Sequence, residues 1–369
     1  MEEEKKLYPF KIIPIEEEGS GATVLLADLG YPDSLVQNGW LSTSSISEIM
    51  EMYMDRVVGE DAFAYYGRQF PVMLRHLGSQ CRTPLLVHPD DTIAAERFDF
   101  LGKAKLWYVK SVSKGGRIAL GFRRDVGAEE FYMACRHNCV EEMLNVVEPH
   151  AGESFFIAPG TVHAALGGVE IIEVAQSSPL DFRLCEWGEK VELDPFDAEL
   201  GLEAAFDFID YRKFRSAGEG HCHHTHDHGG PKITRRLTDN PEFTVTEVNL
   251  TDPLHIYCEK FGSFVAYVCL GGSACVEVNV PGAGKERYVI GEGETLLVPA
   301  EVPDFFLVPL KDGTILLETI SEKREEIDSY TLEEKDHDDE GCGCGCEDED
   351  GHECGCGCHH HHHHEDIPS

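Results

Sequence analysis

The sequence is poor in basic side chains and has no long apolar run. Lysine and arginine together number 31 against 68 aspartates and glutamates, so the formal net charge is −37. A surface this negative repels phosphate backbones and anionic lipid headgroups, and we therefore expect neither a nucleic acid nor a membrane as a partner. The longest apolar runs, such as FVAYVCL and TVLLADL, are too short to cross a bilayer.

The N-terminal segment also lacks the apolar stretch of a secretory signal peptide. Its sequence, MEEEKKLYPFKIIPI, is charged first and then alternates. We therefore expect a cytoplasmic protein. Cysteine, by contrast, is plentiful: eight of the 14 cysteines are scattered between positions 81 and 275 without a tight framework, and six lie in the C-terminal tail. Without a secretion signal, reduced thiols are expected rather than disulfides.

Short apolar or alternating runs separated by Gly, Pro and Asp dominate most of the chain. Examples are LWYVKSV, RIALGF, VEIIEVAQ, FTVTEV and TLLVPA. Runs of this kind predict a mainly β chain folded as an antiparallel sandwich or barrel. Helical periodicity appears only at 45–60 and 198–214, where apolar residues repeat at three- and four-residue spacing.

One internal echo indicates how the strands are divided. GESFFI at 152–157 recurs as GETLLV at 293–298, and each copy is followed by a proline, a short turn and a second strand. Two copies of such a unit favour two similar jelly-roll domains. The alternative stays open that Gly-Glu before an apolar run is only a common turn, because only these two residues are identical.

Composition indicates the domain boundaries. Residues 217–231 are polar and His-rich and are expected to form a linker or long loop. We therefore expect an N-terminal domain over 1–216 and a C-terminal domain over 232–328. The segment 329–369 is acidic, rich in Cys, Gly and His and nearly free of apolar residues, so we expect it to be disordered without a ligand.

Five segments of the N-terminal half match an ordered set of motifs. They are FPVMLRHLG (70–78), LLVHPDD (85–91), GKAKLWYV (102–109), LNVVEPHAGESFFIAPGTVHAAL (144–166) and VAQSSPLDFRLCEWG (174–188). In this order they resemble the type I mannose-6-phosphate isomerases, and the resemblance runs through most of 1–325. It implies two cupin domains, each a jelly roll or double-stranded β-helix, with a few α-helices. It also implies an isomerase of carbohydrate metabolism that interconverts mannose 6-phosphate and fructose 6-phosphate, its small-molecule partners.

The same resemblance implies a divalent metal, usually zinc, held by Gln, His, Glu and His. The two histidines correspond to His88 and His163, which are therefore the expected metal ligands; the alternative is that they are satisfied core or rim histidines. The glutamine position is Leu86 and the glutamate position is Lys105. Leucine cannot coordinate a metal, and an ammonium group repels a dication. We therefore expect a divergent member with two of the four ligand positions substituted.

Aldose–ketose isomerisation through an enediol requires a base near the carbon, an electrophile at the oxygens and a cation for the phosphate. The resemblance implies that Lys103 serves the active centre and Arg183 the phosphate, although Arg183 could instead pair with Glu186. Lys105 is predicted either to replace the metal as electrophile or to be an exposed strand residue, and the second interpretation is slightly favoured.

The base is not identified by the sequence, and Asp90 and Glu173 are the acidic side chains to test. HPDD alone is also a good turn sequence. Trp107 and Tyr108 are expected to lie in the core.

The C-terminal tail is rich in metal-binding side chains, unlike the N-terminal motif site, where two ligand positions are substituted. CGCGC occurs twice, with a histidine between the copies and six histidines after them. Thiolates and imidazoles at this density suit zinc, nickel, cobalt or copper. A purification tag is the alternative for the six histidines, but the flanking CGCGC and EDIPS and the His-rich 217–231 segment favour a native origin. The expected tail ligands are Cys342, Cys344, Cys346, His352, Cys354, Cys356, Cys358, His359, His360, His361, His362, His363 and His364.

Three functions remain open from the sequence. The first is an isomerase of the mannose-6-phosphate type with altered metal dependence. The second is a non-catalytic cupin protein that binds a sugar phosphate or a metal and acts as a sensor or metal buffer. The third is an isomerase scaffold with a metal-storage tail that is unrelated to its pocket.

Overall fold

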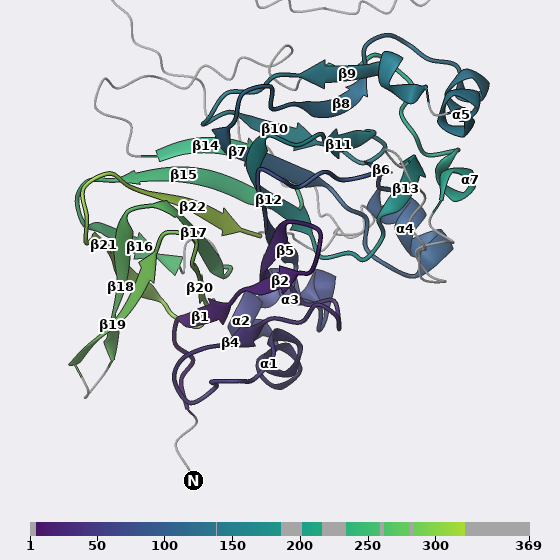
Figure 1. Ribbon diagram of the computed structural model, residues 1–369. Helices are drawn as coiled ribbons and strands as arrows, with labels where there is room; N and C mark the ends of the chain where they lie inside the picture. The colour runs from purple at the N-terminus through teal and green to yellow at the C-terminus, as the bar shows by residue number, and fades with distance from the viewer. Residues whose placement is uncertain are drawn as a thin grey trace, which may run out of the picture. The chain divides into compact units, whose positions relative to one another are not determined.

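Strands dominate the chain, as the punctuated apolar runs predict (Figure 1). The computed structural model describes residues 5–137, 139–185, 201–215, 234–258, 262–280 and 284–321. The predicted linker 217–231 and tail 329–369 lie outside these residues, and so do all the expected tail ligands. Across the described ranges no helix is both long and apolar enough to cross a membrane.

Two antiparallel sheets face each other in the N-terminal half and form the first barrel. The larger sheet has the order β10-β7-β12-β5-β3-β2, and the smaller has the order β13-β6-β11-β8-β9. The strands of the first barrel are β2 (Ile15–Glu17), β3 (Ala22–Leu26), β5 (Val72–Leu77), β6 (Leu85–Val87), β7 (Lys105–Val112), β8 (Ile118–Phe122), β9 (Leu144–Val147), β10 (Ser154–Ile157), β11 (His163–Ala165), β12 (Val169–Gln176) and β13 (Phe182–Cys185).

The second barrel is built in the same way from the C-terminal half. Its larger sheet has the order β14-β15-β22-β17-β20-β1-β4, and its smaller sheet has the order β16-β21-β18-β19. The strands are β1 (Phe10–Ile13), β4 (Leu35–Val36), β14 (Thr234–Asp239), β15 (Thr244–Leu250), β16 (Leu254–Tyr257), β17 (Val265–Gly271), β18 (Ser273–Val280), β19 (Gly284–Gly291), β20 (Thr295–Val298), β21 (Asp304–Pro309) and β22 (Thr314–Ile320).

The strand order of the first barrel is repeated in the second. β10-β7-β12-β5-β3 corresponds to β20-β17-β22-β15-β14, and β6-β11-β8-β9 corresponds to β16-β21-β18-β19. The two Gly-Glu segments precede β10 and β20, which hold equivalent places in this order. A common turn would not reproduce nine strand positions, so the echo marks a repeated jelly-roll unit. The mainly β, two-cupin fold predicted from the sequence is confirmed.

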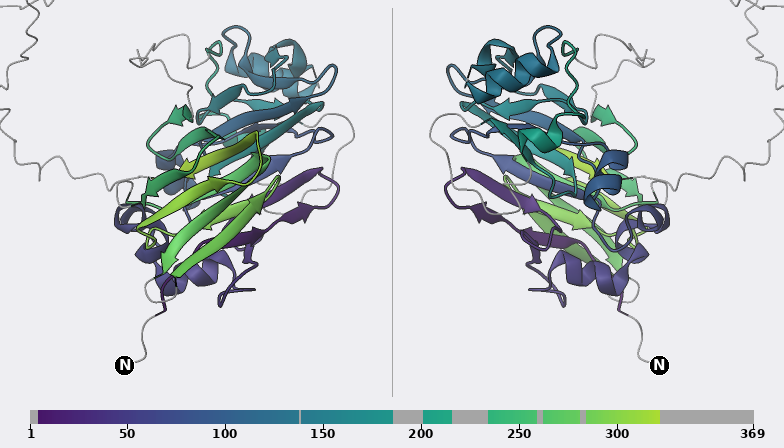
Figure 2. Two further views of the ribbon diagram at one scale, coloured as in Figure 1. Left: turned by 90° about the vertical axis from the view of Figure 1, so that its left-hand side faces the viewer. Right: turned by 90° about the vertical axis from the view of Figure 1, so that its right-hand side faces the viewer.

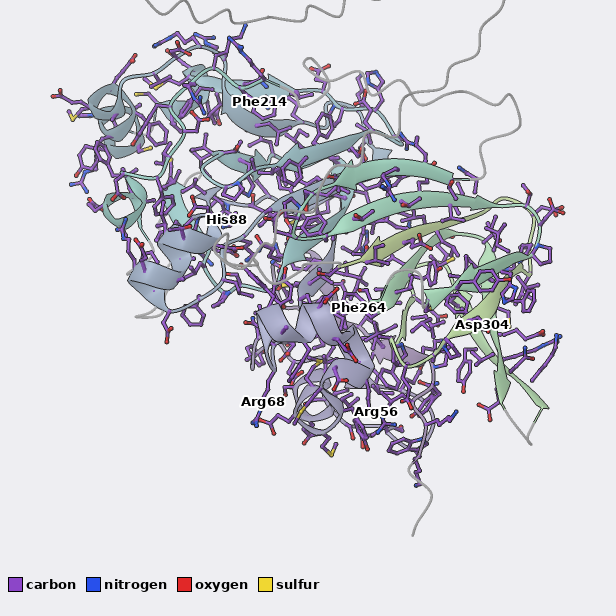
Figure 3. The ribbon with its side chains drawn as sticks, turned by 180° about the vertical axis from the view of Figure 1, so that it is seen from behind. Arg56, Arg68, His88, Phe214, Phe264 and Asp304 are labelled. Carbon is purple, nitrogen blue, oxygen red and sulfur yellow. The ribbon has the colours of Figure 1, made fainter. Side chains whose placement is uncertain are left out.

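The N-terminal strands β1 and β4 lie in the sheet of the second barrel, where β1 pairs with β20 and β4 pairs with β1 (Figure 1). The outer faces of the two larger sheets also share one apolar core, which includes Leu74 and Leu106 from the first barrel and Phe264 and Leu317 from the second. In Figure 2 the sheets of the two halves follow one another as layers. Phe264 is labelled near the middle of the molecule in Figure 3.

Short helices cover the sheets. They are α1 (Ile46–Tyr53), α2 (Asp55–Val58), α3 (Glu60–Tyr66), α4 (Asp91–Phe98), α5 (Ala128–Arg136), the 3₁₀ helix η1 (Val140–Glu142) and α7 (Leu202–Ala205). The predicted helical region 45–60 is confirmed as α1, α2 and the start of α3. Ser45 and Glu48 form a capping box at its beginning.

The helix predicted over 198–214 is wrong for residues 206–214, because only α7 forms in the described part of that segment. Beyond the turn that follows α7, its backbone forms hydrogen bonds with the first barrel. The Asp210 N–H donates to the Gly160 carbonyl over 2.9 Å, and the Phe214 N–H donates to the Phe122 carbonyl over 2.8 Å. The periodic apolar residues, Phe208 among them, pack on the smaller sheet from this irregular segment.

Candidate active site

The end of β6 and the start of β11 bring the two motif histidines to one end of the first barrel. Leu86 is paired with His163 across the two strands, so both side chains leave the sheet on the same face. His88 lies two residues after Leu86 and points to that face as well. Leu85 and Val87 point the other way, into the core under the helices. Figure 3 labels His88 beside α4.

The rings of His88 and His163 meet at their Nε2 atoms, which lie 3.2 Å apart. The Nδ1 of His88 is 2.8 Å from the Leu180 carbonyl oxygen, and the Nδ1 of His163 is 2.9 Å from the Thr161 carbonyl oxygen. A carbonyl only accepts, so each Nδ1 holds the hydrogen. Burial, with the nearby Lys105 charge, lowers the pKa of His88 well below its usual value and that of His163 to about 3. Both rings are therefore neutral, and two nitrogen lone pairs converge.

Lys105 is fully buried beside this pair, so its interpretation as an exposed strand residue is wrong. Lys105, Trp107 and Val109 alternate along β7 toward the interior of the first barrel, whereas Leu106 and Tyr108 face the shared core. The expected burial of Trp107 and Tyr108 is confirmed. The Nζ of Lys105 is 3.3 Å from Glu173 Oε2 and 3.9 Å from Asp181 Oδ1. Among the residues described, this Nζ has no hydrogen-bond partner.

Lys103 lies next to Lys105 in the same buried cluster. Its Nζ donates a hydrogen bond to Asp181 Oδ1 over 2.7 Å. Burial lowers the pKa of Lys103 to about 8, and the charges of Lys105 and Arg75 act in the same direction against the attraction of Asp181. Burial alone would raise the pKa of Asp181, but Lys103 and Lys105 hold it well below its usual value. The Asp181 side chain is 30 % exposed, so the cluster meets solvent there.

Glu173 is held from two sides. Arg75 Nε donates to its Oε1 over 3.0 Å, and Trp107 Nε1 donates to its Oε2 over 2.7 Å. Burial alone would raise the pKa of Glu173, but Arg75, Lys105 and the Trp107 N–H together hold it well below its usual range. The carboxylate is therefore ionised and fully engaged.

The second barrel repeats this aromatic–glutamate pair. Trp107 is paired with Glu173 across β7 and β12, and Tyr267 is paired with Glu318 across the equivalent strands β17 and β22. The Tyr267 hydroxyl donates to Glu318 Oε2 over 2.7 Å. Because the pair occurs in both barrels, it belongs to the cupin framework.

The lysine is specific to the first barrel. Lys105 is paired with Ile157, the last residue of β10, and Val265 is paired with Val298, the last residue of β20. The equivalent interior position is therefore a cation in one barrel and an aliphatic side chain in the other. The chemistry of this chain is concentrated in the first barrel.

The expected metal finds two of its ligands in place, His88 and His163. The glutamine position is occupied by the buried Leu86, and the glutamate position by the ammonium of Lys105. Within the described ranges no group of three or more His, Cys, Asp or Glu is close enough to hold a metal ion. Zinc sites in proteins use three or four protein ligands. The residues present do not complete such a site.

The remaining sequence candidates fall in different places. Arg183 is paired with Leu86 across β13 and β6, so it leaves the sheet on the face of the histidines; its possible partner Glu186 lies outside the described residues. Asp90 is the N-cap of α4, where its Oδ1 accepts the Ile93 N–H over 2.8 Å, and its side chain does not join the cluster.

Sequence reasoning missed Asp181 and Arg75. Asp181 lies in the matched segment VAQSSPLDFRLCEWG, two residues before the candidate Arg183, and this neighbourhood was the available signal. Arg75 lies in the matched segment FPVMLRHLG, where a charge inside an apolar strand indicated a buried partner. A separate cavity of about 460 Å³, lined by Asp125, Arg212 and Phe214 among others, does not include the cluster. Figure 3 labels Phe214 and His88 at different places in the first barrel.

Comparisons with known proteins agree with this architecture. No family model matches the chain. It is 24 % identical over 318 residues to the mannose-6-phosphate isomerase ManA of Bacillus subtilis, a match that covers 81 % of this chain and 95 % of that protein. It is 26 % identical over 230 residues to the mannose-6-phosphate isomerase of Streptococcus mutans, covering 62 % of this chain and 68 % of that protein.

The crystal structure of the mannose 6-phosphate isomerase from Bacillus subtilis superposes with a TM-score of 0.70 at 19 % identity, covering 84 % of this chain and 99 % of that one. Fold and site together define a two-cupin protein whose first barrel holds a buried cluster of histidine, lysine and carboxylate side chains. The resemblance predicted from the motifs is confirmed: the chain is similar in sequence to mannose-6-phosphate isomerases, and it shares the fold of one of them.

Proposed function

We propose that this chain is an aldose–ketose isomerase that interconverts mannose 6-phosphate and fructose 6-phosphate in the first barrel. The observation that supports this most directly is the cluster of His88, His163, Lys103, Lys105 and Asp181, which joins neutral imidazoles, cations and a carboxylate at one end of the barrel. The similarity to a protein named mannose-6-phosphate isomerase covers 81 % of this chain, which supports the same reaction.

Each side chain has a role in this proposal. Lys105 stabilises the negative charge that develops on the sugar oxygens as the enediol forms, because its ammonium is buried and has no hydrogen-bond partner among the described residues. Lys103 holds Asp181 in place through the 2.7 Å hydrogen bond. Arg183, on the same face as Leu86, binds the phosphate.

Asp181 is the proposed base at the carbon, and it is a weak one because Lys103 and Lys105 hold its pKa well below its usual value. Its side chain is 30 % exposed, which makes it the more accessible of the two carboxylates in the cluster. Glu173 is only 1 % exposed and is engaged by Arg75 and Trp107, which leaves it the role of a framework anion. Asp90 is used as a helix cap. The structure therefore favours a base that differs from both acidic residues suggested by the sequence.

Turnover of mannose 6-phosphate to fructose 6-phosphate by the purified full chain is the direct test. Lys105→Met and Asp181→Asn are expected to lower kcat by about 100-fold or more, as loss of a single charge-stabilising or proton-transferring group does. Lys110→Met is the matched control, because Lys110 lies on the same strand but pairs at the surface with Glu170 and Glu292. It is expected to leave kcat within about twofold of the wild type.

A second candidate is a cupin protein that binds the sugar phosphate without converting it. It is favoured by the burial of His88, His163 and Lys105, each at most 2 % exposed. Calorimetric titration with mannose 6-phosphate distinguishes the two functions. Binding without turnover supports the second candidate, and turnover that survives in Lys105→Met contradicts the proposed role of that lysine.

We further propose a cytoplasmic location and the domain division 1–216, 217–231, 232–328 and 329–369, in which β1 and β4 of the first segment complete the sheet of the second barrel. The Cys- and His-rich tail is proposed to bind zinc, nickel, cobalt or copper ions through its CGCGC and histidine runs, which supply soft and borderline ligands at high density. A chain cut after residue 328 is expected to lose this metal uptake. Unchanged uptake by the shortened chain would contradict the tail proposal.

A further inference from the structure

Two histidines, His88 and His163, face each other through their Nε2 atoms. The Nε2 lone pairs of His88 and His163 converge over 3.2 Å, because both Nδ1–H groups are committed to backbone carbonyls. Two acceptors at this distance repel each other unless a donor or a cation lies near both. The histidine pair therefore requires a hydrogen-bond donor or a cation near both Nε2 atoms.

The spacing alone suits a metal ion. Two nitrogens bound to one tetrahedral zinc at its usual bond length lie about 3.3 Å apart. The surroundings do not suit one. Leu86 supplies no donor, and the described residues offer no third ligand among His, Cys, Asp and Glu. The histidine pair has the geometry of a metal site whose other ligands are absent.

The charges around the histidine pair also disfavour a bound metal ion. Glu173 and Asp181 already face three cations, Arg75, Lys103 and Lys105. No carboxylate of this cluster is left to neutralise an additional dication, and Lys105 is fully buried beside the place that the dication would take. Repulsion between like charges is strongest where water is excluded. The site already contains its cation, and this cation is covalently attached.

The ammonium of Lys105 is incompletely bonded. It has three N–H groups, yet its Nζ has no hydrogen-bond partner among the described residues and lies 3.3 Å from the nearest Glu173 oxygen. A buried polar group without a partner is costly. Unpaired donors on Lys105 and unpaired acceptors on the two imidazoles together match a ligand that both accepts and donates hydrogen bonds. Hydroxyl and carbonyl oxygens on neighbouring carbons have this chemistry.

We infer that Lys105 takes the place of the divalent metal, and that His88, His163 and Lys105 bind two oxygens on adjacent carbons of a sugar phosphate without any metal ion. Each imidazole accepts a hydrogen bond from one hydroxyl group, and the ammonium donates to the oxygen that gains negative charge. The choice of a sugar phosphate as ligand rests on the proposed function. The replacement of the metal by Lys105 rests only on the residues of the cluster.

Binding of mannose 6-phosphate to the wild-type full chain, with and without chelator, tests the metal-free site directly. The dissociation constant is expected to be the same within about twofold, because no metal takes part. A loss of affinity of tenfold or more in chelator, restored by zinc or manganese, overturns the inference. This measurement uses only the wild-type protein, so its outcome does not depend on whether a variant folds.

Metal content provides a second arm that does not depend on the sugar. The full chain is stripped, reloaded with zinc and compared with Leu86→Gln/Lys105→Glu and with His88→Leu/His163→Leu. The tail is present in all three proteins, so its contribution cancels. The wild type is expected to hold as much zinc as the double histidine variant, and Leu86→Gln/Lys105→Glu one equivalent more. One extra equivalent in the wild type relative to the double histidine variant contradicts the inference.

The vicinal oxygens are tested with 2-deoxyglucose 6-phosphate, which lacks one of them. The wild type is expected to bind it at least tenfold more weakly than mannose 6-phosphate, and Lys105→Met to lose most of this difference. Equal affinity for the two sugars in the wild type overturns the proposed contact. Failure of the proposed function has another signature, since chelator-independent binding with no turnover leaves the metal-free site intact and removes only the isomerase.

Discussion

The Trp107 indole N–H donates to Glu173 over 2.7 Å, and in the second barrel the Tyr267 hydroxyl donates to Glu318 over the same distance. One pair adjoins Lys105, whereas the other faces no lysine at the equivalent position, which is Val265. The duplicated unit thus kept one internal hydrogen bond in both copies. In the first copy the glutamate also contacts Arg75 and Lys105, beside the imidazole pair of His88 and His163.

This duplication predicts that Tyr267→Phe weakens the fold without affecting the site. The substitution leaves the ring in place and removes the donor to Glu318, so the free energy of unfolding is expected to fall by about 1–3 kcal/mol. Urea denaturation measures the loss. Mannose 6-phosphate binding is expected to be unchanged, and a drop in affinity would show that the second barrel communicates with the first.

The ion pair of Lys103 and Asp181 predicts a coupled loss. Lys103→Met leaves Asp181 without its 2.7 Å donor, and Asp181→Asn leaves a buried ammonium next to Lys105. Each single change is expected to cost about 1–3 kcal/mol, less than a fully buried pair because Asp181 is 30 % exposed. A double-mutant cycle measured by urea denaturation checks the coupling. Single effects that simply add would exclude a direct interaction.

Much of the first barrel could be predicted from the sequence because its information is local. The repeated strand–turn–strand unit and the burial of Trp107 and Tyr108 follow from alternation over a few neighbouring residues and from the two-residue period of strands. The meeting of His88 with His163, which are 75 residues apart, is not local and was implied by the resemblance to a known family.

The burial of Lys105 could not be predicted in this way, because lysines are mostly exposed and the general expectation is correct for most of them. Its burial depends on Glu173 and Asp181, which follow much later in the chain and reach the barrel interior only through the fold. The helix prediction for residues 206–214 was wrong for a related reason. Its apolar residues repeat at the spacing of a helix, but its backbone forms hydrogen bonds with strands such as β8.

Buried Asp28 predicts a pH-dependent contribution to stability. Its Oδ2 accepts the Phe70 N–H over 2.8 Å, and burial raises its pKa from 3.8 to about 6. A carboxyl that holds its proton more tightly in the folded state stabilises the fold fully below its unfolded pKa. This stability is lost as the pH rises through the folded pKa, because the buried group must then ionise.

Asp28→Asn removes this loss and keeps an oxygen for the Phe70 N–H. At pH 8 the variant is expected to be more stable than the wild type by about 1–3 kcal/mol, and near pH 4 the difference is expected to shrink toward zero. Urea denaturation at several pH values measures the difference. Asp312→Asn, at an exposed position, is the control and is expected to show no such trend. A constant difference across this range would show that ionisation of Asp28 is not involved.

Gly59, between α2 and α3, predicts a steric limit where the N-terminal helices meet the second barrel. Its φ is +93°, and a Cβ there would lie 1.8 Å from the Gly262 carbonyl oxygen. Gly59→Ala is expected to cost at least about 3 kcal/mol, because the added methyl group meets backbone that cannot rotate away.

Gly67→Ala is the matched control for this effect. Gly67 caps α3 with a φ of +62°, but nothing lies within 4 Å of the position that an added methyl group would take. This substitution has only the conformational penalty of a backbone region that side chains rarely adopt, about 1–3 kcal/mol. Urea midpoints of the two variants measure the contrast. Equal losses would mean that Gly59 and Gly262 do not approach closely in solution, whereas a larger loss at Gly59 assigns the excess to that contact.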